Sequence, residues 1–299
     1  MGRKSQAGWP ALLLGFRLHL EAQGRRPKTI SNYLRDVAAF ARSCPSPPAQ
    51  VTPQDIAAYL ATRRQQVSAK TVREQVLAMR RFFRWLLSEG ELKRDPTQGL
   101  RLPSFRTPVM PAYTRTEVQR LLMACDRRRP LGLRDYAMVL VLYDTGMRVG
   151  ELCSMTCEGL DWERGVARVV GKTGPREVPL GRNAQEALQR YMRRWGIEEG
   201  PVWRGERGRL TEGGVLQAIR RLCYRSGVEA KGVHAFRRAA AIEMKRSGMN
   251  DSDILEVLGW RSITMLRRYI AQEAKTLAFE AHRQCSPGDR LRWPSLRAP

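Results

Sequence analysis

Apolar residues recur every three or four positions in four separate stretches of about the first 90 residues. This spacing is that of one face of an α-helix. It predicts helices over 9–22, after Pro27, after Thr52 and over about 70–88. The third stretch begins with a hydroxyl at the N-cap, Thr52, and a proline at the first helical position, Pro53. The pattern therefore predicts a compact module of four helices.

The apolar periodicity stops between about 95 and 112, where four prolines lie close together. Such a stretch is typical of an extended linker between domains. Periodicity resumes after residues 114–117, which read Thr-Arg-Thr-Glu and form a capping box. We predict a helical domain over 1–100, a linker over 101–112 and a second domain over 113–299.

Helical and strand patterns alternate in the second domain. The segment Leu133–Tyr143 is apolar at almost every position, which predicts a helix buried on most sides. Two short β-type runs, Val166–Val170 and Arg176–Leu180, flank a turn that contains Lys172 and predict a small antiparallel hairpin. The fold class is therefore mainly α with a small antiparallel sheet (α+β). Further helices are expected after the caps Asn183, Thr211 and Asn250 and over 273–282.

The formal net charge of +24 is divided evenly along the chain. Residues 1–110 carry 19 Lys+Arg against 7 Asp+Glu, and residues 111–299 carry 34 against 22, so each part is +12. Both parts are therefore expected to bind a polyanion, as in a protein that closes on nucleic acid from two sides. The alternative is a basic protein without special affinity. Four arginines of the fourth predicted helix are partly off its apolar stripe and either line a DNA groove or are solvated: Arg73, Arg80, Arg81 and Arg84.

Cysteine usage and hydropathy disfavour other classes of protein. The six cysteines include no C-x-x-C pair, and with only three histidines a zinc site is disfavoured, although Cys153 and Cys157 are four apart. We expect buried, reduced thiols and no metal or other cofactor. The apolar run over 11–14 is too short to span a bilayer or to serve as a signal peptide. We expect a cytoplasmic protein.

One stretch of the chain gathers the residue types that bind and attack phosphate. His234 and Arg237 are three apart on a segment of helical composition, so both project from one face. A short helix ends at Gly259, Trp260 follows it, and Tyr269 comes nine residues later in a basic setting. A histidine, an arginine, an indole and a phenol brought together by three short helices would suit a phosphodiester.

Four motifs stand in order along the chain: T-G-M-R-V-G-E-L at 145–152, G-K-T-G at 171–174, H-A-F-R at 234–237, and L-G-W followed by tyrosine at 269. In this order and spacing they resemble the tyrosine recombinases, the family of phage integrases and bacterial Xer recombinases. The resemblance covers nearly the whole chain. It implies a four-helix, SAM-like core-binding domain followed by a catalytic domain, most like a simple two-domain Xer-type recombinase.

The resemblance also implies roles for individual residues. Tyr269 would attack a DNA phosphate, giving a 3′-phosphotyrosyl link and a free 5′-hydroxyl. Arg148 and Arg237 would bind the non-bridging oxygens, where planar guanidinium groups offer paired, charged donors to a transition state that gains negative charge. Lys172 would protonate the leaving 5′-oxygen, and His234 would assist proton transfer at the tyrosine.

Two further positions complete the expected set. Trp260 stands where many family members have histidine, and its indole N–H donates but cannot titrate, so a hydrogen bond to phosphate and a packing role are expected. Glu151 matches the acidic position of its motif and is expected to orient its neighbours. The chain departs from the common pattern at Arg238 and Ala239, where His-Thr is usual.

The expected activity is site-specific recombination of double-stranded DNA core sites by a homo- or hetero-tetramer, through a Holliday junction, without metal or ATP. Three alternatives remain: a type IB topoisomerase or telomere resolvase, a catalytically inactive DNA-binding protein, and a general RNA-binding protein. Relaxation of supercoils without recombinant product would favour the first. The segment after Tyr269 either docks on a neighbouring subunit or packs on its own domain.

Overall fold

The computed structural model of the chain describes residues 8–104, 111–171, 174–205, 208–271 and 273–291. The chain divides into two compact units, Met1–Pro108 and Val109–Pro299. Residues 105–110 of the expected linker lie outside the described residues.

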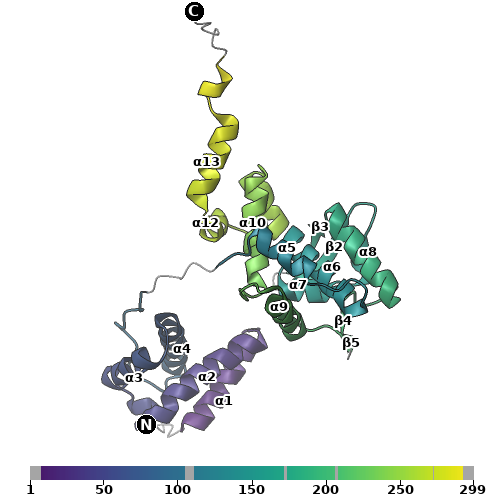
Figure 1. The fold of residues 1–299 in the computed structure, drawn as a ribbon. Helices are drawn as coiled ribbons and strands as arrows, with labels where there is room; N and C mark the ends of the chain where they lie inside the picture. Colours follow the sequence, from purple (N-terminus) through teal and green to yellow (C-terminus); the bar gives the residue numbers. More distant parts are fainter. Residues whose placement is uncertain (1–7, 105–110, 172–173, 206–207, 272, 292–299) are drawn as a thin grey trace, which may run out of the picture. The chain divides into compact units, whose positions relative to one another are not determined.

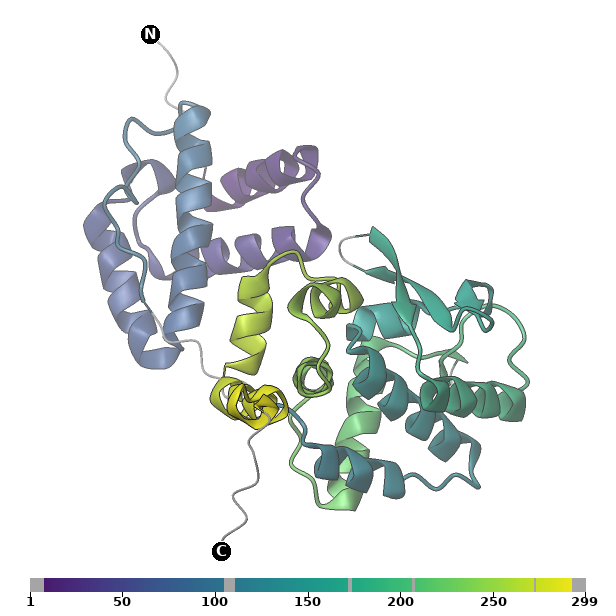
Figure 2. The ribbon, with the colours of Figure 1, turned by 90° about the horizontal axis from the view of Figure 1, so that it is seen from above.

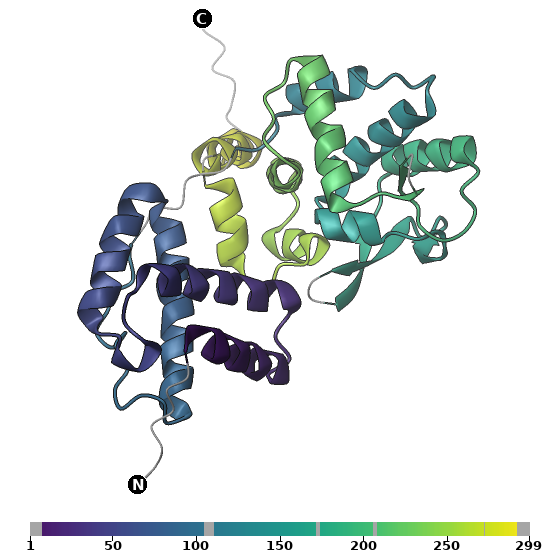
Figure 3. The same cartoon turned by 90° about the horizontal axis from the view of Figure 1, so that it is seen from below.

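The described part of the first unit is helical, as the sequence predicts (Figure 1). Figure 3 shows its first two helices side by side, and the second also packs against the fourth. The core is aromatic: Phe16, Phe40, Phe82 and Phe83 are fully buried. The predicted cap of the third helix is confirmed, because Asp55 accepts the Thr52 N–H at 2.9 Å. The elements are α1 (Trp9–Ala22), α2 (Pro27–Ser43), η1 (Pro48–Gln50), α3 (Pro53–Gln66) and α4 (Ala69–Ser88).

The four arginines of α4 differ in their surroundings. Arg73 donates to the Pro103 carbonyl at 3.4 Å, and Arg80 donates to the Leu100 carbonyl. These two side chains hold the segment that follows the module against α4. Arg81 binds Gln23, whereas the side chain of Arg84 is 72% exposed and lies 3.9 Å from Asp95.

The second unit combines helices with two small antiparallel sheets in its described residues. Figure 2 shows the longer hairpin beside the short helix α11, which it contacts. The elements are α5 (Arg115–Met123), α6 (Pro130–Thr145), α7 (Val149–Ser154), η2 (Cys157–Gly159), β1 (Leu160–Asp161), β2 (Val166–Gly171), β3 (Gly174–Pro179), α8 (Arg182–Trp195), β4 (Arg204–Gly205), β5 (Gly208–Arg209), α9 (Glu212–Ser226), α10 (His234–Arg246), α11 (Asp251–Leu258), α12 (Ile263–Ile270), α13 (Ala274–Cys285) and η3 (Gly288–Arg290).

Most predicted elements of this unit are confirmed, and two details are wrong. The N-cap of helix α8 is Gly181, two residues before the predicted cap Asn183, and the Asp144 carboxylate accepts the Gly181 N–H at 2.7 Å. The expectation that all six thiols are buried fails, since Cys285 at the end of α13 is exposed and Cys44 and Cys157 are half-buried.

Helix α6 lies at the centre of the second unit, packed against α5, α8 and α10. Ten of its residues are buried, among them the ion pair Arg134–Asp135, in agreement with its mainly apolar sequence. Helices α10, α11 and α12 form a separate small apolar cluster around Leu258, Trp260 and Leu266, against which Tyr269 packs. Within the described residues, no helix has the length and apolar character needed to cross a bilayer.

A substitution at Gly146, which ends α6, tests how closely α6 packs against α10 and α11. Its φ of 58° is left-handed, and a Cβ there would lie 2.6 Å from Leu258 Cδ2 and 2.9 Å from Ala240 Cβ. Gly196, which ends α8, has the same φ and no atom within 4 Å of such a Cβ. We expect Gly196→Ala to lower the free energy of unfolding by about 1 kcal/mol and Gly146→Ala by about 3 kcal/mol, because only the latter adds overpacking.

Urea denaturation followed by circular dichroism measures both variants. Equal losses at the two positions would show that α6, α10 and α11 do not pack as closely at Gly146 as described.

Candidate active site

The turn after α6 fixes the place of Arg148. Gly146 ends the helix in the left-handed conformation, and the buried Thr145 hydroxyl accepts the Met147 N–H at 3.1 Å. Arg148 then becomes the N-cap residue of α7. Its backbone N–H donates to Glu151 Oε2 at 2.8 Å, and its Nη1 donates to Oε1 at 2.7 Å. The motif 145–152 therefore holds one arginine by both backbone and side chain.

Glu151 is the buried carboxylate of the site, with a side chain 0% exposed. Arg176 of β3 donates to it with Nη2 at 2.9 Å and Nε at 3.3 Å. Burial alone would raise the pKa of Glu151, but the hydrogen bonds from Arg176 and from the Arg148 backbone outweigh burial and lower the pKa to about 2. Glu151 is therefore ionised at neutral pH and orients both arginines, as its motif position suggests.

Arg237 lies in the first turn of α10 and is 2% exposed. Its Nη1 donates to the Gly146 carbonyl at 2.8 Å and its Nη2 to the Leu258 carbonyl. Burial, followed by repulsion from Arg148, lowers the pKa of Arg237 to about 10. The guanidinium stays charged at neutral pH, close enough to Arg148 for the two charges to repel.

The rings of Trp260 and Tyr269 lie next to each other, with Arg237 over the first. The Arg237 Cζ lies 4.9 Å from the centroid of the Trp260 ring, and the Trp260 and Tyr269 ring centroids are 4.7 Å apart. Arg238 covers the tyrosine, with its Cζ 5.1 Å from the ring centroid. The two arginines of α10 thus flank two rings tilted by 51° to each other, which come from just after α11 and from α12.

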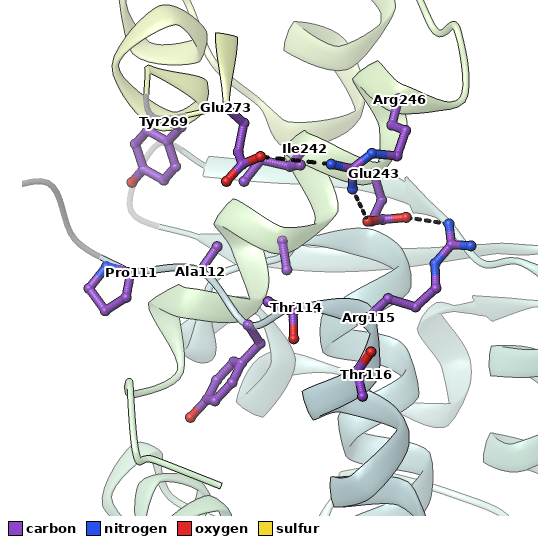
Figure 4. A pocket seen from close by; sticks show the side chains of 12 residues that line it. Pro111, Ala112, Thr114, Arg115, Thr116, Ile242, Glu243, Arg246, Tyr269 and Glu273 are labelled. Atoms are coloured by element: carbon purple, nitrogen blue, oxygen red, sulfur yellow. Dashed lines mark hydrogen bonds and ion pairs between the residues drawn. The ribbon is translucent and has the colours of Figure 1, made fainter. Parts of the chain in front are cut away.

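Tyr269 is half-buried and lines a pocket of about 510 Å³. Figure 4 shows its hydroxyl directed away from Glu273, at one end of this pocket. On the other side of the pocket, Arg246 bridges Glu243 at 2.7 Å and Glu273 at 3.8 Å. The Tyr269 ring therefore packs on the apolar cluster of α10–α12 on one side and lines an open pocket on the other.

His234 lies at the start of α10 and remains accessible to solvent. Partial burial and the positive charges of Arg237, Arg238 and Arg148 lower the pKa of His234, while Glu212 of α9 opposes them. The imidazole is accordingly neutral at neutral pH. It can then accept a proton or donate one hydrogen bond.

The structure brings together the predicted residues Arg148, Glu151, His234, Arg237, Trp260 and Tyr269. Lys172 lies outside the described residues, so its place in the site stays a prediction. Its flanking residues Gly171 and Gly174 pair at the end of the β2–β3 hairpin.

The sequence interpretation missed Arg176. A signal was present, because Arg176 lies two residues before Val178 on β3 and so shares its face of the strand, and Val178 is fully buried. An arginine on the inward face of a strand requires a buried acidic or carbonyl partner.

Comparison with known proteins places the chain in a family. A model described as Phage integrase family matches residues 112–276, and one described as Phage integrase, N-terminal SAM-like domain matches residues 12–90. The tyrosine recombinase XerC of Xylella fastidiosa is 31% identical over 262 residues, covering 84% of this chain and 88% of that protein. The tyrosine recombinase XerD of Listeria monocytogenes is 29% identical over 264 residues, covering 83% and 89%.

The fold also matches solved structures. A lambda integrase tetramer bound to a Holliday junction superposes with a TM-score of 0.74 at 23% identity, covering 89% of this chain and 78% of that one. These findings define the class: an enzyme that breaks and rejoins DNA strands. The chain belongs to the phage integrase family, the tyrosine recombinases.

The cationic surroundings of His234 predict how it titrates. An unfolded histidine titrates near pH 6.5, and in the fold the pKa of His234 is lower. Below about pH 6.5 the unfolded state therefore binds more protons, so stability falls as the pH is lowered through that window. NMR titration should show a ring with a pKa below 6.5 that is absent from a His234→Gln protein, and this variant should also lose less stability on acidification. A His234 ring titrating at or above 6.5 would contradict this environment.

Proposed function

We propose that this enzyme carries out site-specific recombination of double-stranded DNA with Tyr269 as the nucleophile. The observation that carries this is the row Arg237, Trp260 and Tyr269: the Arg237 Cζ lies 4.9 Å from the Trp260 ring centroid, and the Trp260 and Tyr269 ring centroids are 4.7 Å apart. Attack of the phenolic oxygen on phosphorus forms a 3′-phosphotyrosyl ester and expels the 5′-oxygen.

Arg148 and Arg237 bind the non-bridging oxygens of that phosphate. Both are held in advance, the first by Glu151 and the second by two backbone carbonyls. Two fixed guanidinium groups in a partly water-excluded site stabilise the charge that develops on the pentavalent phosphorus. Burial and then repulsion from Arg148 lower the pKa of Arg237, and an anion bound between the two arginines would relieve that repulsion.

Proton transfers complete the step. Neutral His234 takes up the phenolic proton or binds the phosphate, Trp260 donates its indole N–H, and Lys172 protonates the departing 5′-oxygen. The phosphotyrosyl ester conserves the energy of the broken phosphodiester, so rejoining needs no ATP.

The proposed assembly is a tetramer, of one recombinase or two, on a pair of DNA core sites in the cytoplasm. The lambda integrase tetramer on a Holliday junction has the same fold and supports this arrangement. The first unit, with the exposed Arg84 on α4, is proposed to grip the DNA together with the catalytic unit. Arg73 and Arg80 contribute less to binding, because their guanidinium groups already hold backbone carbonyls.

The substitution Tyr269→Phe removes only the phenolic oxygen and therefore tests whether Tyr269 is the nucleophile. A nicked duplex carrying a candidate core site should give a protease-sensitive covalent adduct with the wild-type enzyme and none with Tyr269→Phe. Tyr224→Phe is the matched control, since this tyrosine lies on α9 of the same unit and is 90% exposed. Gel electrophoresis of the denatured reaction measures the adduct. Equal adduct formation by Tyr269→Phe and wild type would remove the assignment.

Substitutions around the phosphate test the tryptophan. Trp260→His should keep most of the cleavage rate, because an imidazole N–H can donate the same hydrogen bond, whereas Trp260→Phe should lose about 10²-fold with the donor. Arg148→Ala and Arg237→Ala should each lose about 10³-fold or more. Single-turnover cleavage measures all four. Similar losses in Trp260→His and in both arginine variants would contradict a role limited to hydrogen bonding and packing.

A further inference from the structure

Arg176 uses its whole guanidinium group to join three parts of the catalytic unit. Nε and Nη2 donate to Glu151 of α7, and Nη1 donates to the Val257 carbonyl near the end of α11 at 2.7 Å. The side chain is only 15% exposed. Strand β3, helix α7 and helix α11 are therefore tied to one another through a single residue.

Two glycines leave the space that this pair occupies. A Cβ at Gly171 would lie 2.6 Å from Glu151 Oε1, and a Cβ at Gly259 would lie 3.1 Å from Arg176 Nε. Gly171 is the last residue of β2, directly before Lys172, and Gly259 directly precedes Trp260. The Glu151–Arg176 pair thus fits between the base of the hairpin turn and the helix end that leads to Trp260.

The two strands of the hairpin are held separately. Strand β2 is fixed to α7 by the Val170 N–H, which donates to Ser154 Oγ at 2.8 Å. Strand β3 is fixed by Arg176, which pairs across the ladder with Val169 and lies two residues from Gly174 at the end of the turn. At about 3.3 Å per residue, the Arg176 Cα is about 7 Å from that of Gly174. A shift of its side chain would therefore displace the end of β3 at Gly174.

We propose that Arg176 is a positioning residue that holds strand β3 up to Gly174, the described end of the hairpin, and that proton donation by the general acid to the departing 5′-oxygen depends on it. This rests on the proposed function, in which Lys172 supplies the proton. Without Arg176, Glu151 still holds Arg148 through the Arg148 backbone N–H and Nη1, so binding of the phosphate oxygens is retained. The defect then falls on protonation of the leaving group.

The leaving group itself provides the test. In the normal step Tyr269 Oη bonds to phosphorus, the P–O5′ bond breaks, and the 5′-oxygen takes a proton from the general acid. If the 5′-oxygen is replaced by sulfur, the P–S bond breaks and the sulfur leaves as a stable thiolate, because thiols are far more acidic than alcohols. A residue that acts through the acid therefore loses its importance on the sulfur substrate.

Cleavage rates of Arg176→Ala and Arg176→Lys should be measured on matched oxygen and sulfur substrates, with Lys172→Ala as the reference. We expect Arg176→Ala to cleave the oxygen substrate at least about tenfold more slowly than wild type and the sulfur substrate within about threefold of wild type. Arg176→Lys keeps the positive charge but loses the paired donors of the planar guanidinium, so it should show the same pattern with a smaller loss of cleavage rate. Glu177→Gln, the exposed neighbour on β3 that pairs with Arg164, should match wild type on both.

The outcomes separate the two hypotheses. Equal deficits on oxygen and sulfur, in both Arg176 variants, would overturn the positioning role and assign Arg176 to phosphate binding or to folding. If Arg176→Ala fails to fold, the comparison of oxygen and sulfur substrates with Arg176→Lys tests the positioning role. Failure of wild type to form an adduct, or failure of sulfur to rescue Lys172→Ala, would count against the proposed function instead.

Discussion

One buried carboxylate determines the geometry of this site. Glu151 accepts hydrogen bonds from the backbone and side chain of Arg148 and from two nitrogens of Arg176, while its own side chain is fully buried. Removing two partners from water costs about as much free energy as their attraction returns, so such a group adds little net stability. Its effect is on position, because Arg148 and strand β3 of the hairpin are held by the same two oxygen atoms.

Helix ends supply the second constraint. Helices α6 and α11 both stop at glycines in the left-handed conformation, Gly146 and Gly259, which leaves carbonyls of the last turn without helical partners. Arg237 donates to one carbonyl from each end, where the helix dipoles are negative. A guanidinium that is almost completely buried therefore remains charged beside another arginine, with its pKa lowered only to about 10.

Local chemistry determined most of what could be predicted from the sequence. The helices could be predicted from caps such as Thr52 and Asn250, from the apolar run of α6 and from the glycines at helix ends. The candidate site residues could be predicted from the order of the motifs. Contacts between distant segments could not be predicted in this way. Asp144 moves the start of α8 away from Asn183, and Arg73 and Arg80 bind carbonyls about 20 to 30 residues away. Arg176 of β3 binds Glu151 of α7, which lies 25 residues earlier in the chain.

Trp260 packs between Arg237 and Tyr269 and helps to hold the tyrosine ring in place. Arg237 and Arg238 are consecutive on α10, so their side chains diverge by about 100° around the helix, and each covers one of two rings in contact. A broad indole fills the space between guanidinium and phenol, and its 4.7 Å contact with Tyr269 fixes the ring by packing. Because indole does not titrate, a change of pH alters the charge of His234 but not the surface that supports the tyrosine.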